Sequence, residues 1–192
     1  MDSQKLRNTL IIGGARSGKS NYAQELALKF PQPVLFVATA EAGDEEMRQR
    51  IEEHKKVRPS KWRTLEVTTH VGDRIRQEIE AMQTVIVDCI TLLVNNIFNR
   101  YLNSSGEPSD ASLIEKEVIA EISALVDCIS QVNARFIIVT NEVGLGLVPV
   151  NRMNRLYRDL LGRANQILAQ HTDEIYLMIA GLPVKIKSTK NY

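Results

Sequence analysis

The sequence predicts an α/β fold in which a mostly parallel central sheet of about seven strands carries helices on both faces and ends in an antiparallel hairpin. Two observations support this. Short runs rich in β-branched residues alternate with longer segments of helical period, as in parallel sheets covered by helices. The last two runs are separated only by "GLP", which is too short for a crossover helix, so they should pair as a hairpin.

The strands are predicted from their apolar runs. "TLII", "VLFVA", "TVIVD" and "FIIVT" are nearly continuous apolar segments, which is typical of strands buried on both faces. "TLEVT" is a weaker run that should join the same sheet, and "IYLMIA" and "VKIK" form the final hairpin. In chain order, the expected strands are residues 9–12, 34–38, 64–68, 84–88, 136–140, 175–180 and 184–187.

The helices are predicted between these strands, from their helical period. Turn residues dominate only one connection, "NSSGEPSD" at 103–110, which we expect to be a mobile surface loop rather than a lid. Asp110, with Glu115 and Glu117 nearby, is typical of an acidic helix start. The expected helices are residues 19–29, 44–57, 71–82, 90–102, 110–132 and 151–171.

Length and composition narrow the classes of function. A chain of 192 residues is long enough for one well-cored domain and short for two, so residues 1–192 should form a single domain. The 24 Lys and Arg residues balance 23 Asp and Glu residues, which favours a small-molecule substrate over nucleic acid. Cys89 and Cys128 lack zinc-site spacing, and no apolar tract has the length of a signal peptide or membrane span. We therefore expect a cytoplasmic protein with free thiols and no membrane span.

A glycine-rich loop between the first strand and the first helix predicts a phosphate site. "GGARSGKS" fits the pattern GxxxxGK[ST], in which backbone N–H groups and a helix N-terminus converge on phosphates. The lysine should reach the β and γ phosphates, and the final hydroxyl should face Mg²⁺. The alternative is a glycine turn that carries a lysine by chance. The predicted nucleotide-binding residues are Gly13, Gly14, Ala15, Arg16, Ser17, Gly18, Lys19 and Ser20.

Acidic residues at the carboxyl ends of neighbouring strands predict the second part of a magnesium site. Asp88 follows directly on the apolar run "TVIV" and should hold Mg²⁺ together with Ser20, directly or through water. The alternative for Asp88 is a helix N-cap. Glu142 follows "FIIVTN" at the same edge of the sheet, and the sequence favours neither a functional nor a structural role for it.

A histidine in the second helix has two possible interpretations. Met47, Ile51 and His54 lie at positions i, i+4 and i+7, so the imidazole shares a helix face with two apolar side chains. A histidine in this pattern is usually a packed core residue. A cluster of basic residues follows it, however, and could form a second anionic site in which the imidazole is a nucleophile at phosphorus. These basic residues are Lys55, Lys56, Arg58, Lys61 and Arg63.

Several motifs together resemble a known enzyme family. "GGARSGKS", "ATA" followed by "DEEMRQRI" and a histidine, "RPSKWRT", "VDCIT" and "VTNEVGLGLVP" occur in the order and spacing of bifunctional adenosylcobinamide kinase/adenosylcobinamide-phosphate guanylyltransferases. The similarity runs from about residue 9 to residue 187. The phosphate loop is shared with many enzymes, whereas the histidine-bearing helix and "VTNEVGLGLVP" are much more particular.

The resemblance implies a P-loop NTPase fold of the RecA-like type and two reactions. A nucleoside triphosphate such as ATP phosphorylates the aminopropanol hydroxyl of adenosylcobinamide, and GMP is then transferred from GTP through a histidine that matches His54. Lys19 would be catalytic in both reactions, Mg²⁺ would be required, and the protein would form a homotrimer. The further GTP contacts of the family match Ala38, Thr39, Ala40, Lys55, Lys56, Val57, Arg58, Glu66 and Asp88.

Two other functions are compatible with the phosphate loop. One is a small-molecule kinase that transfers only the γ-phosphoryl group, with His54 merely packed. The other is a non-catalytic nucleotide switch, in which the loop drives a change of conformation. The three hypotheses differ in whether GTP labels the protein covalently at His54.

Overall fold

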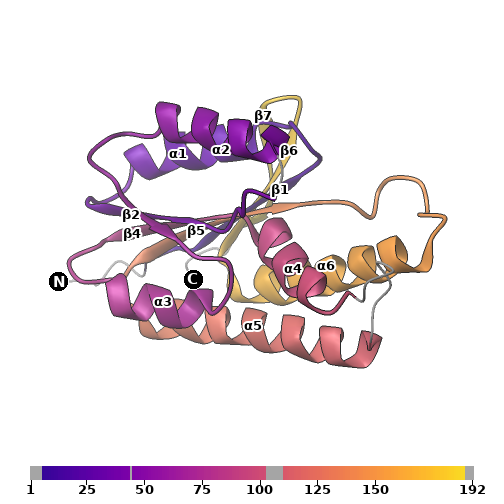
Figure 1. Cartoon of the computed structure of the whole chain (residues 1–192). Coiled ribbons are helices and arrows are strands. Elements are labelled where there is room, and N and C mark those ends of the chain that lie inside the picture. The colour runs from indigo at the N-terminus through magenta and orange to yellow at the C-terminus, as the bar shows by residue number, and fades with distance from the viewer. Residues whose placement is uncertain (1–5, 44, 103–109, 189–192) are drawn as a thin grey trace.

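The computed structural model describes residues 6–43, 45–102 and 110–188. Strands and helices alternate along these residues as the sequence predicts (Figure 1). The strands are β1 (Thr9–Gly13), β2 (Val34–Ala38), β3 (Arg63–Glu66), β4 (Thr84–Asp88), β5 (Arg135–Asn141), β6 (Glu174–Ile179) and β7 (Leu182–Ser188). The helices are α1 (Lys19–Leu28), α2 (Glu45–Val57), α3 (Val71–Glu78), α4 (Ile90–Arg100), α5 (Ala111–Gln131) and α6 (Arg152–His171).

The strands form one sheet in the order β3-β2-β4-β5-β1-β6-β7. Pairing is parallel from β3 through β6 and antiparallel between β6 and β7, which confirms the predicted mostly parallel sheet and C-terminal hairpin. The hairpin turns at Ala180 and Gly181, whose φ angles are 50° and 84°. The carboxyl ends of β1, β2, β4 and β5 therefore lie at one edge of the sheet, where open α/β sheets bind ligands.

Helices cover both faces of the sheet. In Figure 1, α1 and α2 lie over one face, and α3, α4, α5 and α6 lie over the other. Successive strand residues alternate between two hydrophobic clusters. Leu35 and Val37 pack on the side of the four helices, whereas Phe36 packs with Ala23 and Ala27 of α1. This alternation explains why the strands appear as continuous apolar runs.

The observed element bounds differ from the predicted ones in a few places. Helix α3 ends at Glu78 rather than at residue 82, because Ala81 has a left-handed φ of 61° that a helix cannot continue. Strand β3 ends at Glu66, although Val67 still donates a backbone hydrogen bond to Ala38. Asp110 is the N-cap of α5, which confirms a helix start at this residue, although the first turn of α5 contains no acidic side chain. The Asp110 Oδ1 accepts from the N–H groups of Ser112 and Leu113 at 2.9 and 3.2 Å.

Residues 103–109 of the predicted surface loop lie outside the described residues. Within the described ranges, none of the helices is both long enough and apolar enough to cross a bilayer.

Candidate active site

The phosphate loop joins β1 to α1 in a conformation that depends on glycine. Gly18 lies at the N-cap of α1 with φ of 91°, in the left-handed region that favours glycine. A Cβ on Gly13 would lie 2.6 Å from the carbonyl oxygen of Met178, so a side chain there would collide with β6. The N–H of Gly181 donates to the carbonyl of Ser17 at 3.0 Å, which attaches the hairpin turn to the loop. Strand, loop and helix thus occur in the order that a phosphate cradle needs.

Lys19 lies within the loop rather than in solvent. Its side chain is buried, and its Nζ donates to the carbonyl oxygen of Gly14 at 2.6 Å and to Ser17 Oγ at 3.4 Å. Burial lowers the pKa of Lys19, and the charges of Cys89 and Asp88 act in the opposite direction. The predicted phosphate-binding cation is therefore held against the loop backbone, beside the exposed residues Gly14, Ala15 and Arg16.

Asp88, at the carboxyl end of β4, faces the loop. Burial raises the pKa of Asp88, while a hydrogen bond with the Ser20 side chain and the positive charges of His54, Lys19 and Arg58 oppose that shift. The N-cap of α4 is Cys89, so the interpretation of Asp88 as that helix's N-cap is wrong. One carboxylate thus interacts with the hydroxyl and the lysine of the loop and with α2.

Ser20 and Asp88 fit a magnesium ion. Their hydroxyl and carboxylate are hydrogen-bonded to each other, and oxygen ligands of this kind are the ones that Mg²⁺ prefers. Among the residues that the structure describes, no group of three or more His, Cys, Asp and Glu side chains forms a metal site. A magnesium ion here would therefore take most of its ligands from phosphate oxygens and water, as is usual at nucleotide sites.

Helix α2 carries His54 on an exposed surface. Met47 and Ile51 are partly buried, but none of the described side chains of α2 is buried, and His54 is exposed. The interpretation of His54 as a packed core residue is therefore wrong. The charge of His54 opposes the rise in the pKa of Asp88, so the imidazole lies within electrostatic range of the candidate magnesium site.

Residues 55–58, at the end of α2 and directly after it, are predicted to bind nucleotide. Two of them contact the sheet. Lys55 Nζ lies 2.9 Å from Glu66 Oε1 at the end of β3. Arg58 donates to Thr64 Oγ1 at 2.8 Å, and its guanidinium carbon lies 3.6 Å from the centroid of the Phe36 ring. Lys56 and Val57 are exposed.

Thr39 connects the ends of β2 and β4. Its side chain is fully buried, and its hydroxyl donates to the Cys89 carbonyl at 2.7 Å and accepts from the Cys89 N–H at 2.8 Å. Asn96 of α4 donates to the Thr39 carbonyl at 2.8 Å. Asn96 is a positioning residue that the sequence did not single out. Burial raises the pKa of the Cys89 thiol to about 12, which disfavours a thiolate nucleophile here.

The carboxyl end of β5 also joins the loop. The N–H of Glu142 donates to the Gly13 carbonyl at 3.0 Å, and the Glu142 carboxylate accepts from the N–H of Gly144. The N–H of Asn141 donates to Thr91 Oγ1 of α4 at 2.8 Å. The Glu142 carboxylate thus has a local structural partner in the segment that follows β5.

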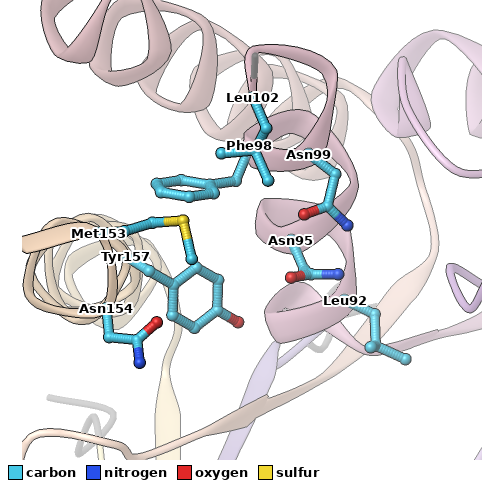
Figure 2. A pocket seen from close by; sticks show the side chains of 8 residues that line it. All are labelled: Leu92, Asn95, Phe98, Asn99, Leu102, Met153, Asn154 and Tyr157. Atoms are coloured by element: carbon cyan, nitrogen blue, oxygen red, sulfur yellow. The ribbon is translucent and has the colours of Figure 1, made fainter. Parts of the chain in front are cut away.

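Two cavities lie among the described residues outside the phosphate loop. One, of about 550 Å³, is lined by Ala40 and Glu66, which the sequence predicts to bind nucleotide, and also by His70 and Arg74. The other, of about 360 Å³, lies between α4 and α6 (Figure 2). Neither is lined by a residue of the phosphate loop. Sequence reasoning missed the second cavity, although Asn95 and Asn99 of "LLVNNIFN" line it.

Solved structures are similar to this fold at low sequence identity. A Pyrococcus horikoshii OT3 protein solved in a structural study of project PH0250 aligns with a TM-score of 0.54 and 10% identity, over 96% of this chain and 88% of its own. An ATPase from the type III secretion system of pathogenic bacteria aligns with a TM-score of 0.51 and 11% identity, over 93% of this chain and 56% of its own. These similarities concern the fold alone, and they agree with the predicted P-loop NTPase architecture.

Sequence comparison identifies the family. The family described as cobinamide kinase / cobinamide phosphate guanyltransferase matches residues 9–186. The bifunctional adenosylcobalamin biosynthesis protein CobU of Salmonella typhimurium is 41% identical over 180 residues, which cover 93% of this chain and 98% of that protein. The corresponding CobP protein of Pseudomonas aeruginosa is 39% identical over 178 residues, covering 93% and 96%. The chain therefore belongs to the cobinamide kinase / cobinamide phosphate guanyltransferase family.

Proposed function

We propose that this protein phosphorylates the aminopropanol hydroxyl of adenosylcobinamide and then transfers GMP from GTP to the new phosphate, which gives adenosylcobinamide-GDP. Family membership supports the pair of reactions. The observation that carries the mechanism is that Asp88 interacts with Ser20 and Lys19 of the loop and also with His54 of α2. One phosphate cradle and one histidine thus lie in a single electrostatic environment.

In the first reaction, the loop positions a triphosphate such as ATP. The acceptor hydroxyl oxygen forms a bond to the γ-phosphorus, the bond from that phosphorus to the β,γ-bridging oxygen breaks, and the nucleoside diphosphate leaves as the hydroxyl proton is lost to solvent. Lys19 binds the β and γ phosphates, and Ser20 and Asp88 would hold Mg²⁺, which would neutralise phosphate charge. Catalysis of this kind depends mainly on positioning and charge.

In the second reaction, His54 attacks GTP. An imidazole nitrogen forms a bond to the α-phosphorus, the α,β-bridging P–O bond breaks, and pyrophosphate leaves. An oxygen of adenosylcobinamide phosphate then attacks the same phosphorus and releases the imidazole. The covalent intermediate divides one nucleotidyl transfer into two displacements. The exposure of His54 supports this role, because the imidazole must meet two substrates in turn.

The cavity that Ala40 and Glu66 line is the site we propose for the guanosine moiety. Ala40 and Glu66 line the cavity of about 550 Å³, and both match GTP contacts of the family. A carboxylate accepts hydrogen bonds from the N–H groups of guanine, which adenine does not present in the same arrangement. We propose that residues 38–40, residues 55–58 and Glu66 bind GTP around this cavity, with Thr39 acting through its backbone.

The test is covalent labelling with GTP that carries ³²P at the α phosphate. The wild-type protein should form an acid-labile adduct, and His54→Ala should form none and lose at least about a thousandfold in guanylyl transfer, since its nucleophile is gone. Kinase activity should stay within about threefold, because γ transfer does not use the imidazole. His171→Ala, at the exposed end of α6, is the matched control and should label normally.

Each alternative predicts a different result in the same assay. A single-activity kinase phosphorylates adenosylcobinamide but leaves the wild-type protein unlabelled. A nucleotide switch does neither. An unlabelled wild-type protein in the presence of Mg²⁺ would overturn the guanylyl-transfer mechanism.

We also propose that the protein is a homotrimer. Apolar side chains are exposed on the segment after β5 and on the hairpin, as expected of a surface that is covered in an assembly. Leu147 and Val150 are each 97% exposed, and Leu182 and Ile186 are also exposed. Light scattering should give three times the chain mass of 21.6 kDa, and Leu147→Glu combined with Val150→Glu should lower it. A wild-type mass of one chain would contradict this assembly.

A further inference from the structure

Among the described residues, the cavity between α4 and α6 is lined by neutral side chains only. Leu92, Asn95 and Asn99 lie at positions i, i+3 and i+7 on one face of α4 (Figure 2). Helix α6 contributes Met153, Asn154 and Tyr157 from the opposite side, and Phe98 and Leu102 complete the lining. The absence of Lys, Arg, His, Asp and Glu from this lining disfavours a phosphate or a carboxylate as occupant.

The amides that line this cavity have no side-chain hydrogen bond to any residue that the structure describes. Among the described residues, no hydrogen bond is made by the side chains of Asn95, Asn99 or Asn154, whereas the next residue along α4, Asn96, donates to the carbonyl oxygens of Thr39 and Thr68 at 2.8 and 3.1 Å. Asparagine has a low helix propensity, so the two asparagines on the cavity face do not stabilise α4 locally. Each amide offers two donors and one acceptor toward a ligand.

The inner wall of the cavity is apolar and fixed. The rings of Phe98 and Tyr157 pack edge to face with centroids 5.8 Å apart, and Figure 2 shows Met153 beside them. The Tyr157 hydroxyl donates to the Thr91 carbonyl at 3.0 Å, so it is already committed to the first turn of α4. The cavity therefore combines a rigid apolar wall with amides that are free to bind, as ligand pockets typically do.

A short chain of contacts connects this cavity to the phosphate loop. Tyr157 bonds to Thr91, and the Thr91 hydroxyl accepts from the N–H of Asn141 at 2.8 Å. The next residue, Glu142, donates from its N–H to the Gly13 carbonyl at 3.0 Å. The cavity is thus linked to the phosphate loop through the first turn of α4 and the carboxyl end of β5.

We infer that the cavity between α4 and α6 binds a peripheral carboxamide arm of the corrinoid acceptor, with Asn95 and Asn99 as its hydrogen-bonding residues. This inference rests on the proposed function, because it takes the acceptor from there. A corrinoid of this class is a large apolar ring edged with neutral primary amides. Those amides match the asparagines in hydrogen-bonding capacity, and the methylene groups that carry them match the wall of Phe98 and Met153.

The test measures binding of adenosylcobinamide by equilibrium dialysis, read from the visible absorbance of the corrinoid. Asn95→Ala combined with Asn99→Ala should raise its Kd roughly tenfold, because two hydrogen bonds are lost. Asn95→Asp combined with Asn99→Asp keeps the side-chain shape and removes the donors, so it should also raise the Kd. Asn133→Ala, an exposed asparagine at the opposite end of β5, is the control and should leave the Kd unchanged.

The GTP reaction separates the possible outcomes. The KM for GTP in the labelling of His54 should stay within about twofold in the double variants, since that step needs no corrinoid. A raised KM for GTP with an unchanged corrinoid Kd would assign the cavity to the nucleoside and overturn the inference. An unchanged corrinoid Kd in both double variants would overturn it as well, while the proposed function would stand. A wild-type protein that binds no adenosylcobinamide would overturn both.

Discussion

The phosphate loop and helix α2 are held to the sheet in different ways. The loop is joined to β6 by a close backbone approach at Gly13, and α1 behind it buries Ala23 and Ala27 in the core. Helix α2 has no buried side chain among those described, and polar contacts such as that between Lys55 and Glu66 join it to the sheet. Elements with few buried apolar contacts open at low free-energy cost. A rigid loop beside a weakly held helix that carries the proposed nucleophile suits the proposed use of one nucleotide site for transfer at two phosphorus atoms.

Substitution of Gly13 should disrupt the rigid attachment of the phosphate loop to β6. The added methyl group of Gly13→Ala would lie 2.6 Å from the Met178 carbonyl oxygen and 3.1 Å from Met178 Cβ, so the loop or β6 must move. We expect a loss of about 2–3 kcal/mol of stability, a fall in Tm of roughly 5–10 °C and a loss of at least about a hundredfold in both reactions. Thermal unfolding and the two activity assays measure these effects.

Gly14→Ala is the matched control for this substitution. A Cβ on Gly14 meets no atom of the described structure within 4 Å. Its Tm should therefore stay within about 2 °C of the wild type. Equal losses of Tm in the two variants would contradict the close approach of Gly13 to β6.

Substitution of Asp88 should show that burying this carboxylate beside the phosphate loop lowers the stability of the fold. Because burial raises the pKa of Asp88, its ionised form is less favourable in the folded protein than in the unfolded chain. Asp88→Asn should therefore raise Tm by about 2–4 °C at neutral pH, while both reactions fall roughly tenfold for lack of a carboxylate toward Mg²⁺. Thermal unfolding and activity assays at several pH values measure the two effects.

The pH dependence of this difference follows from the sign of the shift. The folded wild-type protein binds a proton at Asp88 at a higher pH than the unfolded chain does, so acidification through the raised pKa stabilises the wild type relative to the variant. The gap in Tm should be widest at neutral pH and should narrow as the pH falls. A gap that widens on acidification would show that Asp88 is stabilised as a carboxylate.

Much of the fold follows from the sequence because its strands are buried on both faces. Runs such as "TVIVD" and "FIIVT" have no polar face, so their type and position were unambiguous. The end of α3 could not be predicted, because Ala81 adopts a left-handed conformation, which is unfavourable for alanine. The strand order could not be predicted from the individual elements either, since it depends on which apolar faces meet in the two hydrophobic clusters.

The candidate site was predictable where chemistry requires a fixed motif. Lys19, Ser20 and Asp88 come together because a glycine loop and a neighbouring strand end at one edge of the sheet. The amides of Asn95 and Asn99 were not predictable, because only the packing of α4 against α6 makes a cavity at their helix face. The contact of Arg58 with Phe36, which attaches the end of α2 to the sheet, was not predictable either, because it depends on how this helix packs against β2.

Lys55→Ala should weaken the attachment of α2 with little effect on the fold. The hydrogen bond with Glu66 raises the pKa of Lys55, yet both side chains are exposed, and exposed ion pairs contribute little to stability. Tm should change by less than about 2 °C, whereas labelling of His54 by GTP should slow roughly three- to fivefold, because α2 is positioned less well and a proposed GTP contact is lost. Arg48→Ala removes the 3.2 Å pair with Glu45 inside the same helix, and it should change neither quantity. Equal labelling rates in the two variants would mean that the Lys55–Glu66 pair does not position His54, and that the contact of Arg58 with Phe36 holds the helix instead.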